Sequence, residues 1–366
     1  MRRFLKNSLQ SAIVVGAVAS ICGAQSLRQE ADKAGLLVGT AIRPAQLSEP
    51  AYASTLAREF NMIEPEDAMK WRALRPTAGS YDFRQADEAV RFAQAHQMKI
   101  RGHCLVWGRD NPDWLTQTSF TPRHLSRLLH EHINRVMKRY KNEVFAWDVI
   151  NEALDENGNV RDSIWYNQPG IGFAGKGSAY IEQVFRWAHK ADPRALLFYN
   201  EAEGERLNHK SDAVYSMVKD FKRRGVPIDG VGLQMHIPTL EVDIASIAAD
   251  VSMNIARLSA LGLQVHITEL DVSLPLDANH RVNPDDLTRQ SDVYRSILRA
   301  CLNNPGCTAI QTWGFTDKYS WIGSHSRGSR GQALPFDRAY QPKAAYHAMW
   351  EELSAGRSAR ADHVDY

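Results

Sequence analysis

The sequence has no excess of charge of either sign. Its 366 residues contain 44 Lys and Arg against 42 Asp and Glu, a formal net charge of +2. Such a balance lacks the positive field that tracks a phosphate backbone, which argues against a nucleic-acid partner. Hydrophobic residues make up 44% of the chain and aromatic residues 9%. These are ordinary globular proportions, and they exclude disordered, collagen-like and coiled-coil chains.

Two kinds of ligand-binding motif are also missing. No glycine-rich GxGxxG or Walker A sequence follows an apolar run, so the sequence does not predict a nucleotide site of these types. No CxxC motif and no histidine cluster at ligand spacing completes a metal site. We therefore expect neither a metal ion nor another cofactor.

The N-terminal apolar stretch, Ala12 to Ile21, is too short to span a bilayer comfortably. It follows a basic start and precedes small residues ending at Ala24, which is the pattern of a secretory signal peptide at residues 1–24. We expect cleavage after Ala24, a secreted or periplasmic location and no membrane attachment afterwards. A lipidated Cys22 is the alternative, but the bulky Ile21 before it disfavours lipidation. Cleavage removes three positive charges and no negative one, which changes the net charge from +2 to −1.

Only four cysteines are present, and one of them lies in the signal peptide. Cys301 and Cys307 flank an Asn-Asn-Pro-Gly turn, and in an oxidising compartment such a pair can close a disulfide. Metal ligation is the alternative use of the pair, but no further ligand motif accompanies it. Cys104 lies within an apolar run, where a buried free thiol is expected.

Short apolar runs alternate with longer amphipathic segments over residues 25–354, without a linker or a break in composition. Eight runs have the composition of parallel strands buried on both faces: Leu36–Ile42, Phe60–Ile63, Met98–Val106, Val144–Ile150, Ala195–Tyr199, Gly230–Met235, Gln264–Leu270 and Ala309–Phe315. Six segments have helical spacing: Phe83–His96, Leu125–Tyr140, Ser178–Lys190, Lys210–Arg224, Ile244–Leu261 and Asp286–Asn303. The alternation predicts a single (β/α)8 barrel of the α/β class, although a doubly wound open sheet gives a similar pattern. The remaining residues, 355–366, form a polar tail that we expect to fray.

Polar side chains gather where the eight apolar runs end. They include Glu66, Lys70, His103, Trp107, Asn151, Glu152, Asn200, Gln234, His236, Glu269, Asp271, Trp313 and Asp317. A barrel brings the carboxyl ends of all its strands to one rim, where its active site lies, whereas an open sheet scatters them along an edge. Indole faces stack on sugar rings, and amides and carboxylates bind hydroxyl groups. The rim therefore suits a carbohydrate.

Glu152 and Glu269 each follow an apolar run directly. A carboxylate at the end of a buried strand is costly unless it is paired or functional, and for one such residue a salt bridge or a helix cap is the usual explanation. Two on one rim indicate glycoside hydrolysis, which needs one carboxylic acid to protonate the leaving oxygen and a second carboxylate opposite it. A separation of about 5–5.5 Å gives retention of configuration, and one of about 6.5–9.5 Å gives inversion.

From about Leu36 to Trp350 the chain resembles the glycoside hydrolase family 10 endo-β-1,4-xylanases. Seven segments carry the resemblance, in order: Glu66-Asp67-Ala68-Met69-Lys70-Trp71; Arg101-Gly102-His103 with Val106-Trp107; Trp147 to Glu152; Leu233-Gln234-Met235-His236; Ile267 to Asp271; Thr312 to Trp321; and Pro335-Phe336-Asp337 with Gln341-Pro342-Lys343. The resemblance implies a barrel that hydrolyses xylan or xylo-oligosaccharides internally and with retention, without a cofactor. We expect a monomer. The pair Cys301 and Cys307 also resembles one in that family.

The resemblance further implies roles for individual residues. Glu269 would be the nucleophile, and Glu152 the general acid and then the general base. His236, held by Asp271, would hydrogen-bond Glu269 and favour its charged form, while Trp and apolar neighbours would keep Glu152 protonated. Asn151 would donate to the 2-hydroxyl group of the sugar. The expected binding residues are Glu66, Asp67, Lys70, His103, Trp107 and Gln234, with Trp313 and Trp321 as walls.

Three positions depart from the family pattern. Asp67 stands where the family usually has Asn, Gly108 where it has His, and Ala202-Glu203 where it has Tyr-Asn. Asp67 keeps an acceptor and loses a donor, and Ala202 removes a stacking surface toward the leaving-group sugars. The departures affect the expected cleavage pattern more than the reaction type.

Three alternative functions are compatible with parts of this pattern. A β-glycosidase or β-1,4-glucanase would use the same machinery, because a hydrophobic wall such as Trp321 discriminates only modestly against the hydroxymethyl group of glucose. A carbohydrate-binding barrel without catalysis would need neither Glu152 nor Glu269. A metal hydrolase would need ligand clusters that the sequence lacks.

Overall fold

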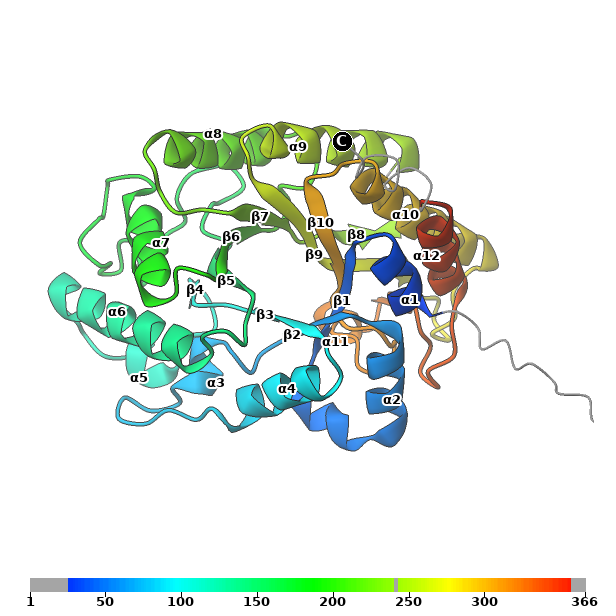
Figure 1. Cartoon of the computed structure of the whole chain (residues 1–366), viewed down its shortest axis with the longest axis horizontal. Coiled ribbons are helices and arrows are strands. Elements are labelled where there is room, and N and C mark those ends of the chain that lie inside the picture. Colours follow the sequence, from blue (N-terminus) through cyan, green and yellow to red (C-terminus); the bar gives the residue numbers. More distant parts are fainter. Residues whose placement is uncertain (1–25, 240–242, 357–366) are drawn as a thin grey trace, which may run out of the picture.

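The structure is a computed structural model that describes residues 26–239 and 243–356 (Figure 1). The predicted signal peptide lies outside the described residues, as does the predicted tail beyond Gly356. Within these ranges, no helix is both long enough and apolar enough to cross a membrane.

Eight parallel strands close into a barrel, because the last of them, β10, pairs with both β9 and β1. In order around the barrel they are β1 (Leu37–Ile42), β2 (Met62–Pro65), β3 (Lys99–Gly102), β5 (Ala146–Asn151), β6 (Leu196–Glu201), β7 (Gly230–Leu233), β9 (Gln264–Pro275) and β10 (Cys307–Thr312). Each predicted apolar run contributes one of these strands. The predicted (β/α)8 barrel is confirmed, and an open sheet is excluded by the β10–β1 pairing.

Three short strands lie beyond the barrel proper. They are β4 (Val106–Trp107), which pairs with β5, β8 (His236–Pro238), which pairs with β9, and β11 (Arg330–Gly331), which pairs antiparallel with β9. The run predicted as one strand over Met98–Val106 is therefore two strands, with His103 in the gap between them. β4 extends the sheet at the carboxyl end of β5, next to Glu152, and β8 extends it along the second half of β9, which contains Asp271.

Helices cover the outside of the barrel (Figure 1). Eight of them connect or follow the barrel strands: α2 (Pro50–Glu59), α4 (Arg84–Ala95), α6 (Pro122–Arg139), α7 (Ala179–Ala191), α8 (His209–Arg223), α9 (Ile244–Ser259), α10 (Pro284–Leu302) and α12 (Ala344–Ala355). The shorter ones are α1 (Leu27–Lys33), η1 (Pro44–Ser48), α3 (Trp71–Leu74), α5 (Asp113–Thr116) and α11 (Ile322–His325). All six predicted helices are confirmed, whereas α1, α2 and α12 were not predicted.

The start of α6 shows how local sequence sets these boundaries. The Thr121 side chain accepts a hydrogen bond from the His124 amide, and Pro122 occupies the first helical position, where its missing N–H costs nothing. Leu125, Leu129 and Ile133 follow at helical spacing and are fully buried. The helix thus begins three residues before the predicted segment Leu125–Tyr140.

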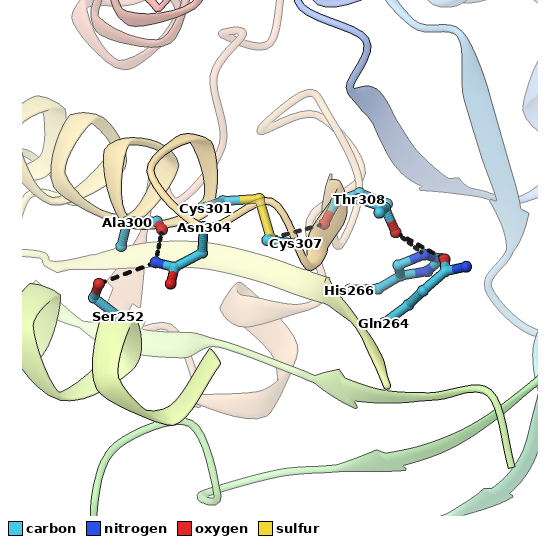
Figure 2. Close-up of a disulfide and its surroundings, with 9 residues drawn as sticks. Ser252, Gln264, His266, Ala300, Cys301, Asn304, Cys307 and Thr308 are labelled. Carbon is cyan, nitrogen blue, oxygen red and sulfur yellow. Dashed lines mark hydrogen bonds between the residues drawn. A yellow bond between two sulfur atoms is a disulfide. The ribbon is translucent and has the colours of Figure 1, made fainter. Parts of the chain in front are cut away.

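Cys301, in the last turn of α10, forms a disulfide with Cys307, the first residue of β10 (Figure 2). The predicted alternatives are thereby resolved in favour of the disulfide. Asn304, in the turn between the two cysteines, donates to the Ser252 hydroxyl of α9 and to the Ala300 carbonyl oxygen. Cys104 is buried and free, as expected from its apolar run.

Candidate active site

A pocket of about 400 Å³ opens at the carboxyl ends of the barrel strands. Eleven of the predicted site residues line it: Glu66, Lys70, His103, Trp107, Asn151, Glu152, Gln234, His236, Glu269, Trp313 and Trp321. Of the other two, Asp271 contacts His236 from behind the pocket and Asp67 contacts Lys70. The pocket therefore collects side chains from every part of the chain between β2 and the segment that follows β10.

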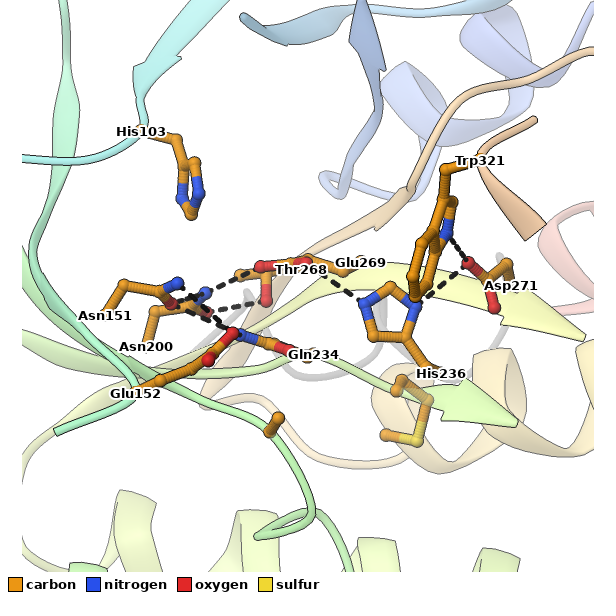
Figure 3. A network of polar contacts seen from close by, with 12 residues as sticks. His103, Asn151, Glu152, Asn200, Gln234, His236, Thr268, Glu269, Asp271 and Trp321 are labelled. Atoms are coloured by element: carbon orange, nitrogen blue, oxygen red, sulfur yellow. Dashed lines mark hydrogen bonds and ion pairs between the residues drawn. The ribbon is translucent and has the colours of Figure 1, made fainter. Parts of the chain in front are cut away.

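The Glu269 carboxylate is held at both oxygens (Figure 3). Asn200 Nδ2 donates to its Oε1 at 2.8 Å, and His236 Nε2 lies 3.1 Å from its Oε2. The residue is almost completely buried. These contacts fix the direction of the carboxylate.

His236 lies between two carboxylates. Its Nδ1 is 2.9 Å from Asp271 Oδ2, which also accepts from Trp321 Nε1 at 2.8 Å. Burial works against a charged imidazole, but the charges of Asp271 and Glu269 and their hydrogen bonds raise the pKa of His236 well above its ordinary value. The imidazolium can then donate from both ring nitrogens at once. The expected contacts of His236 with Glu269 and Asp271 are thus present.

Glu152 directly follows β5 and has a φ of +51°, in the left-handed region that non-glycine residues rarely adopt. Its carboxylate accepts from Trp107 Nε1 at 3.2 Å and from Gln234 Nε2 at 3.1 Å, and it lies 3.9 Å from Arg109 Nη1. The predicted Trp neighbour of Glu152 is therefore present, but the surroundings also include the polar groups of Gln234 and Arg109, which were not predicted. Trp107 presents its N–H edge to the carboxylate rather than its ring face.

An amide network joins the two carboxylates (Figure 3). Asn151 Oδ1 accepts from Gln234 Nε2 at 3.2 Å and from Asn200 Nδ2 at 2.8 Å. Gln234 also bonds Glu152, and Asn200 also bonds Glu269. With its Oδ1 occupied in this way, Asn151 keeps its Nδ2 for a ligand, apart from a long contact of 3.4 Å to Glu152.

Asn200 is a site residue to which the sequence assigned no role. It is fully buried at the end of β6, and its Oδ1 accepts from the Thr268 hydroxyl at 2.7 Å. This bond orients the amide so that its Nδ2 faces Glu269. The sequence feature that points to a role for Asn200 is its position directly after the predicted strand Ala195–Tyr199.

Each of the charged residues Glu66, Asp67 and Lys70, which follow β2, is paired with an opposite charge. Glu66 accepts from Arg43 Nη2 at 2.6 Å, and Lys70 Nζ donates to Asp67 Oδ1 at 2.9 Å. The Lys70 ammonium also lies over the Trp107 ring, 5.1 Å from its centroid. The Asp67 side chain is 52% exposed. Asp67, predicted to bind substrate, is placed by the structure to hold Lys70.

Beneath the pocket, the barrel interior holds a buried ionic cluster. Arg101 Nε lies 2.8 Å from Glu64 Oε2, and its Nη2 bonds Asp148. His103 Nδ1 lies 2.9 Å from Asp148 Oδ2. Glu64, His103 and Asp148 are close enough together to hold a metal ion, but the Arg101 guanidinium already contacts both carboxyl groups. The cluster fixes the His103 ring at the floor of the pocket.

Residues 26–352 match the family described as "Glycosyl hydrolase family 10". The chain belongs to glycosyl hydrolase family 10. It is 39% identical over 344 residues to endo-1,4-beta-xylanase B of Thermotoga neapolitana, covering 93% of this chain and 95% of that protein.

Two solved structures of the family have the same fold. Native xylanase 10B from Thermotoga maritima superimposes with a TM-score of 0.84 at 40% identity, covering 91% of this chain and 99% of that chain. Xylanase 10B from Thermotoga petrophila RKU-1, in complex with xylobiose, gives a TM-score of 0.84 at 39% identity, covering 91% of this chain and 98% of that chain. The barrel and its rim are thus those of a family 10 glycosyl hydrolase.

Seven residues that line this family 10 pocket were not predicted. They are Arg109, Glu156, Arg161, Ala202, Glu203, Lys210 and His325. We refer to the part of the pocket that most of them line as the part beyond Glu152, on the side away from Glu269. Lys210 is paired with the buried Glu201 at 3.0 Å. Two of the three predicted departures, Gly108 and Ala202-Glu203, fall in or beside this set, whereas the third, Asp67, contacts Lys70.

Proposed function

We propose that the protein hydrolyses internal β-1,4 bonds of xylan with retention of configuration. The observation that carries the proposal is that Glu152 and Glu269 open onto one pocket of a family 10 barrel and are joined by a single amide network. The names of the similar proteins, and the xylobiose bound to one of them, support xylan as the polymer.

In the first step, Glu269 attacks the anomeric carbon while Glu152 gives its proton to the leaving oxygen. The glycosidic C–O bond breaks, and an ester forms between the sugar and Glu269. In the second step, Glu152 takes a proton from water, whose oxygen attacks the same carbon and displaces Glu269. Two inversions give net retention, and both carboxyl groups return to their starting states.

The remaining site residues position these two groups and the sugar. Asn200 and His236 hold the Glu269 oxygens, so the attacking atom needs no reorientation. Asn151 has its Nδ2 available for the 2-hydroxyl group, a contact that strengthens in the oxocarbenium-like transition state. Gln234 and Trp107 donate to Glu152 and hold it at the pocket wall.

Preference for xylan over a β-1,4-glucan would come from the wall formed by Trp313 and Trp321. Trp321 is fixed by its bond to Asp271, and its ring packs near the His236 ring, 5.0 Å between centroids. A fixed ring leaves little room for the hydroxymethyl group that glucose carries and xylose lacks. Such a wall gives modest discrimination, about 10–200-fold for one small group.

The export predicted from residues 1–24 is part of the proposal, as is the monomeric state. The disulfide between Cys301 and Cys307 supports export, because such bonds persist in oxidising compartments. Recovery of the mature chain, starting at Gln25, from the periplasm or the medium would test the export. Light scattering of that mature chain would test the monomer.

The reaction is tested by the first anomer released from a linear xylo-oligosaccharide, followed by NMR. We expect the β anomer first, whereas an initial α anomer would exclude double displacement. Soluble cellulose as a second substrate separates a xylanase from a glucanase, and we expect the faster release from xylan.

The roles of the two carboxylates are tested by Glu269→Ala and Glu152→Ala. The first variant should lose turnover of every substrate. The second should retain cleavage of an aryl glycoside whose leaving group needs no proton. Equal losses on xylan and on the aryl glycoside would contradict the acid role of Glu152.

A further inference from the structure

The part of the pocket beyond Glu152 carries two guanidinium groups without an acidic hydrogen-bond partner among the described residues. The Arg109 side chain is 62% exposed, and the carboxylate within 4 Å of it is that of Glu152, at 3.9 Å, which is too long for a hydrogen bond. Arg161 donates from Nη2 to the Leu154 carbonyl oxygen at 3.0 Å, while its Nε is buried and unbonded. Both arginines line the pocket.

Gly108 brings the segments that carry these arginines together. A Cβ atom on Gly108 would lie 3.1 Å from Ser163 Cβ, closer than such atoms normally approach. Trp165 Nε1 donates to the Trp107 carbonyl oxygen at 2.7 Å and ties the same two segments. A side chain at position 108 would require Ser163 to shift by a few tenths of an ångström, so glycine there favours the close approach of the segments that carry Arg109 and Arg161.

The same side of the pocket is widened by a small residue. Ala202 lines it from the end of β6 and fills little of the space. Glu156 and Glu203 also line the pocket, and neither lies within 4 Å of Arg109 or Arg161 in a described ion pair. The site therefore offers two guanidinium groups that form no described hydrogen bond to a carboxylate, with room beside them.

In the proposed mechanism Glu152 protonates the leaving oxygen, so the residues beyond it face the leaving-group sugars. We propose that Arg109 and Arg161 bind the carboxylate of a uronic-acid side chain carried by xylan on that side. The inference rests on the proposed function. A guanidinium presents paired N–H donors that match the two oxygens of a carboxylate, whereas a hydroxyl group offers neither the second oxygen nor the opposite charge.

The test compares kcat/KM on three purified xylo-oligosaccharides of equal length. One is unsubstituted, one carries a uronic-acid side chain on the leaving-group half, and one carries that side chain with its carboxyl group reduced to an alcohol. We expect the native enzyme to prefer the uronic-acid substrate over its reduced form by about tenfold, the effect of one charge-assisted hydrogen bond. This preference should fall as salt is added.

Variants assign the preference to residues. Arg109→Gln and Arg161→Gln should each lower the ratio of kcat/KM on the uronic-acid substrate to kcat/KM on its reduced form, toward one. Glu203→Gln, which removes a negative charge from the same side, should keep or raise the ratio. Arg123→Gln, on the exposed face of α6, is the matched control and should leave all three rates unchanged.

A native ratio near one would overturn the inference, as would equal losses on the acidic and reduced substrates in both arginine variants. Either result is distinct from failure of the proposed function, which would show as no cleavage of the unsubstituted oligosaccharide by the native enzyme.

Discussion

Asp271 controls the orientation of the proposed nucleophile without reaching the pocket. Its Oδ2 accepts from both His236 and Trp321, and these bonds turn the His236 ring so that Nε2 meets Glu269. The orientations of the Glu269 carboxylate and of the Trp321 ring therefore depend on one buried oxygen atom. A change at Asp271 should affect reaction rate more than substrate binding.

We expect Asp271→Asn to lower kcat by about 10–100-fold, the value of one lost charge-assisted bond of about 1.5–3 kcal/mol, with a small change in KM. Without the Asp271 charge, the pKa of His236 falls back toward its ordinary value, so the imidazolium is lost at a lower pH than in the native enzyme. The deficit should grow as pH rises. Profiles of kcat against pH measure it, with the exposed Asp292→Asn on α10 as control, and parallel profiles would contradict the role.

Glu64 gives the protein a second pH dependence, in stability rather than in rate. Burial, and then the charge of Asp148, raise the pKa of Glu64 to about 8, in spite of the nearby Arg101. The folded state thus holds this proton more tightly than the unfolded chain, in which the group titrates near 4.5. The stability linked to the proton is complete below about pH 4.5 and is lost as pH rises through about 8.

Glu64→Gln should flatten this dependence, because the amide cannot ionise. We expect native stability to fall more than that of the variant between pH 5 and pH 8, as measured by urea unfolding at both values. The quantity compared is the change in unfolding free energy between the two pH values, so a loss of stability that is the same at both values does not affect it. An equal change in the native protein and in the variant would mean that Glu64 does not titrate between pH 5 and pH 8.

At the scale of single elements, strand ends were easier to predict than side-chain directions. The positions of Glu152 and Glu269 after apolar runs fixed their place on the rim. The polar surroundings of Glu152 could not be foreseen, because they depend on which edge of Trp107 faces it and on Gln234 from a distant strand. Sequence spacing carries no information on ring rotation.

Helices with one apolar face were predicted, and those that lack one were missed. α12 packs against both α1 and α10, and its buried residues, which include Tyr346, Met349 and Leu353, lie among further apolar ones. A helix covered on two sides has no simple stripe for periodicity to detect. The missed helix α2 begins at Pro50 without a side-chain cap, since Glu49 instead accepts from Lys318 and Tyr319.

The cap of α6 offers a test at this scale. Thr121→Ala removes the acceptor of the His124 amide and should lower the free energy of unfolding by about 1 kcal/mol. Thr121→Ser keeps the oxygen and should cost less. Urea unfolding of the three proteins measures both effects, and equal losses in the two variants would show that the cap contributes nothing.

At the scale of the molecule, closure of the barrel is the feature that local pattern leaves open. β1 and β10 pair along the register Leu37–Ala309 to Thr40–Thr312, from opposite ends of the described chain. The same alternation of strands and helices could leave β1 and β10 as edges of an open sheet. The polar residues at the strand ends favoured the closed barrel, because only a barrel brings all of these ends to one rim.

The disulfide sits where closure is completed, since Cys307 opens β10 and Cys301 ends the helix before it. The bond spans 6 residues, and closing so short a loop in the unfolded chain accounts for about 2 kcal/mol of stability. We expect Cys301→Ser with Cys307→Ser to unfold at a lower temperature than the oxidised native protein and to show no response to a thiol reductant. Native protein treated with the reductant should approach the variant, because both then lack the bond. Because the loop lies at the opposite end of β10 from Trp313, activity at low temperature should be retained, and loss of activity without loss of stability would show that the bond acts on the site itself.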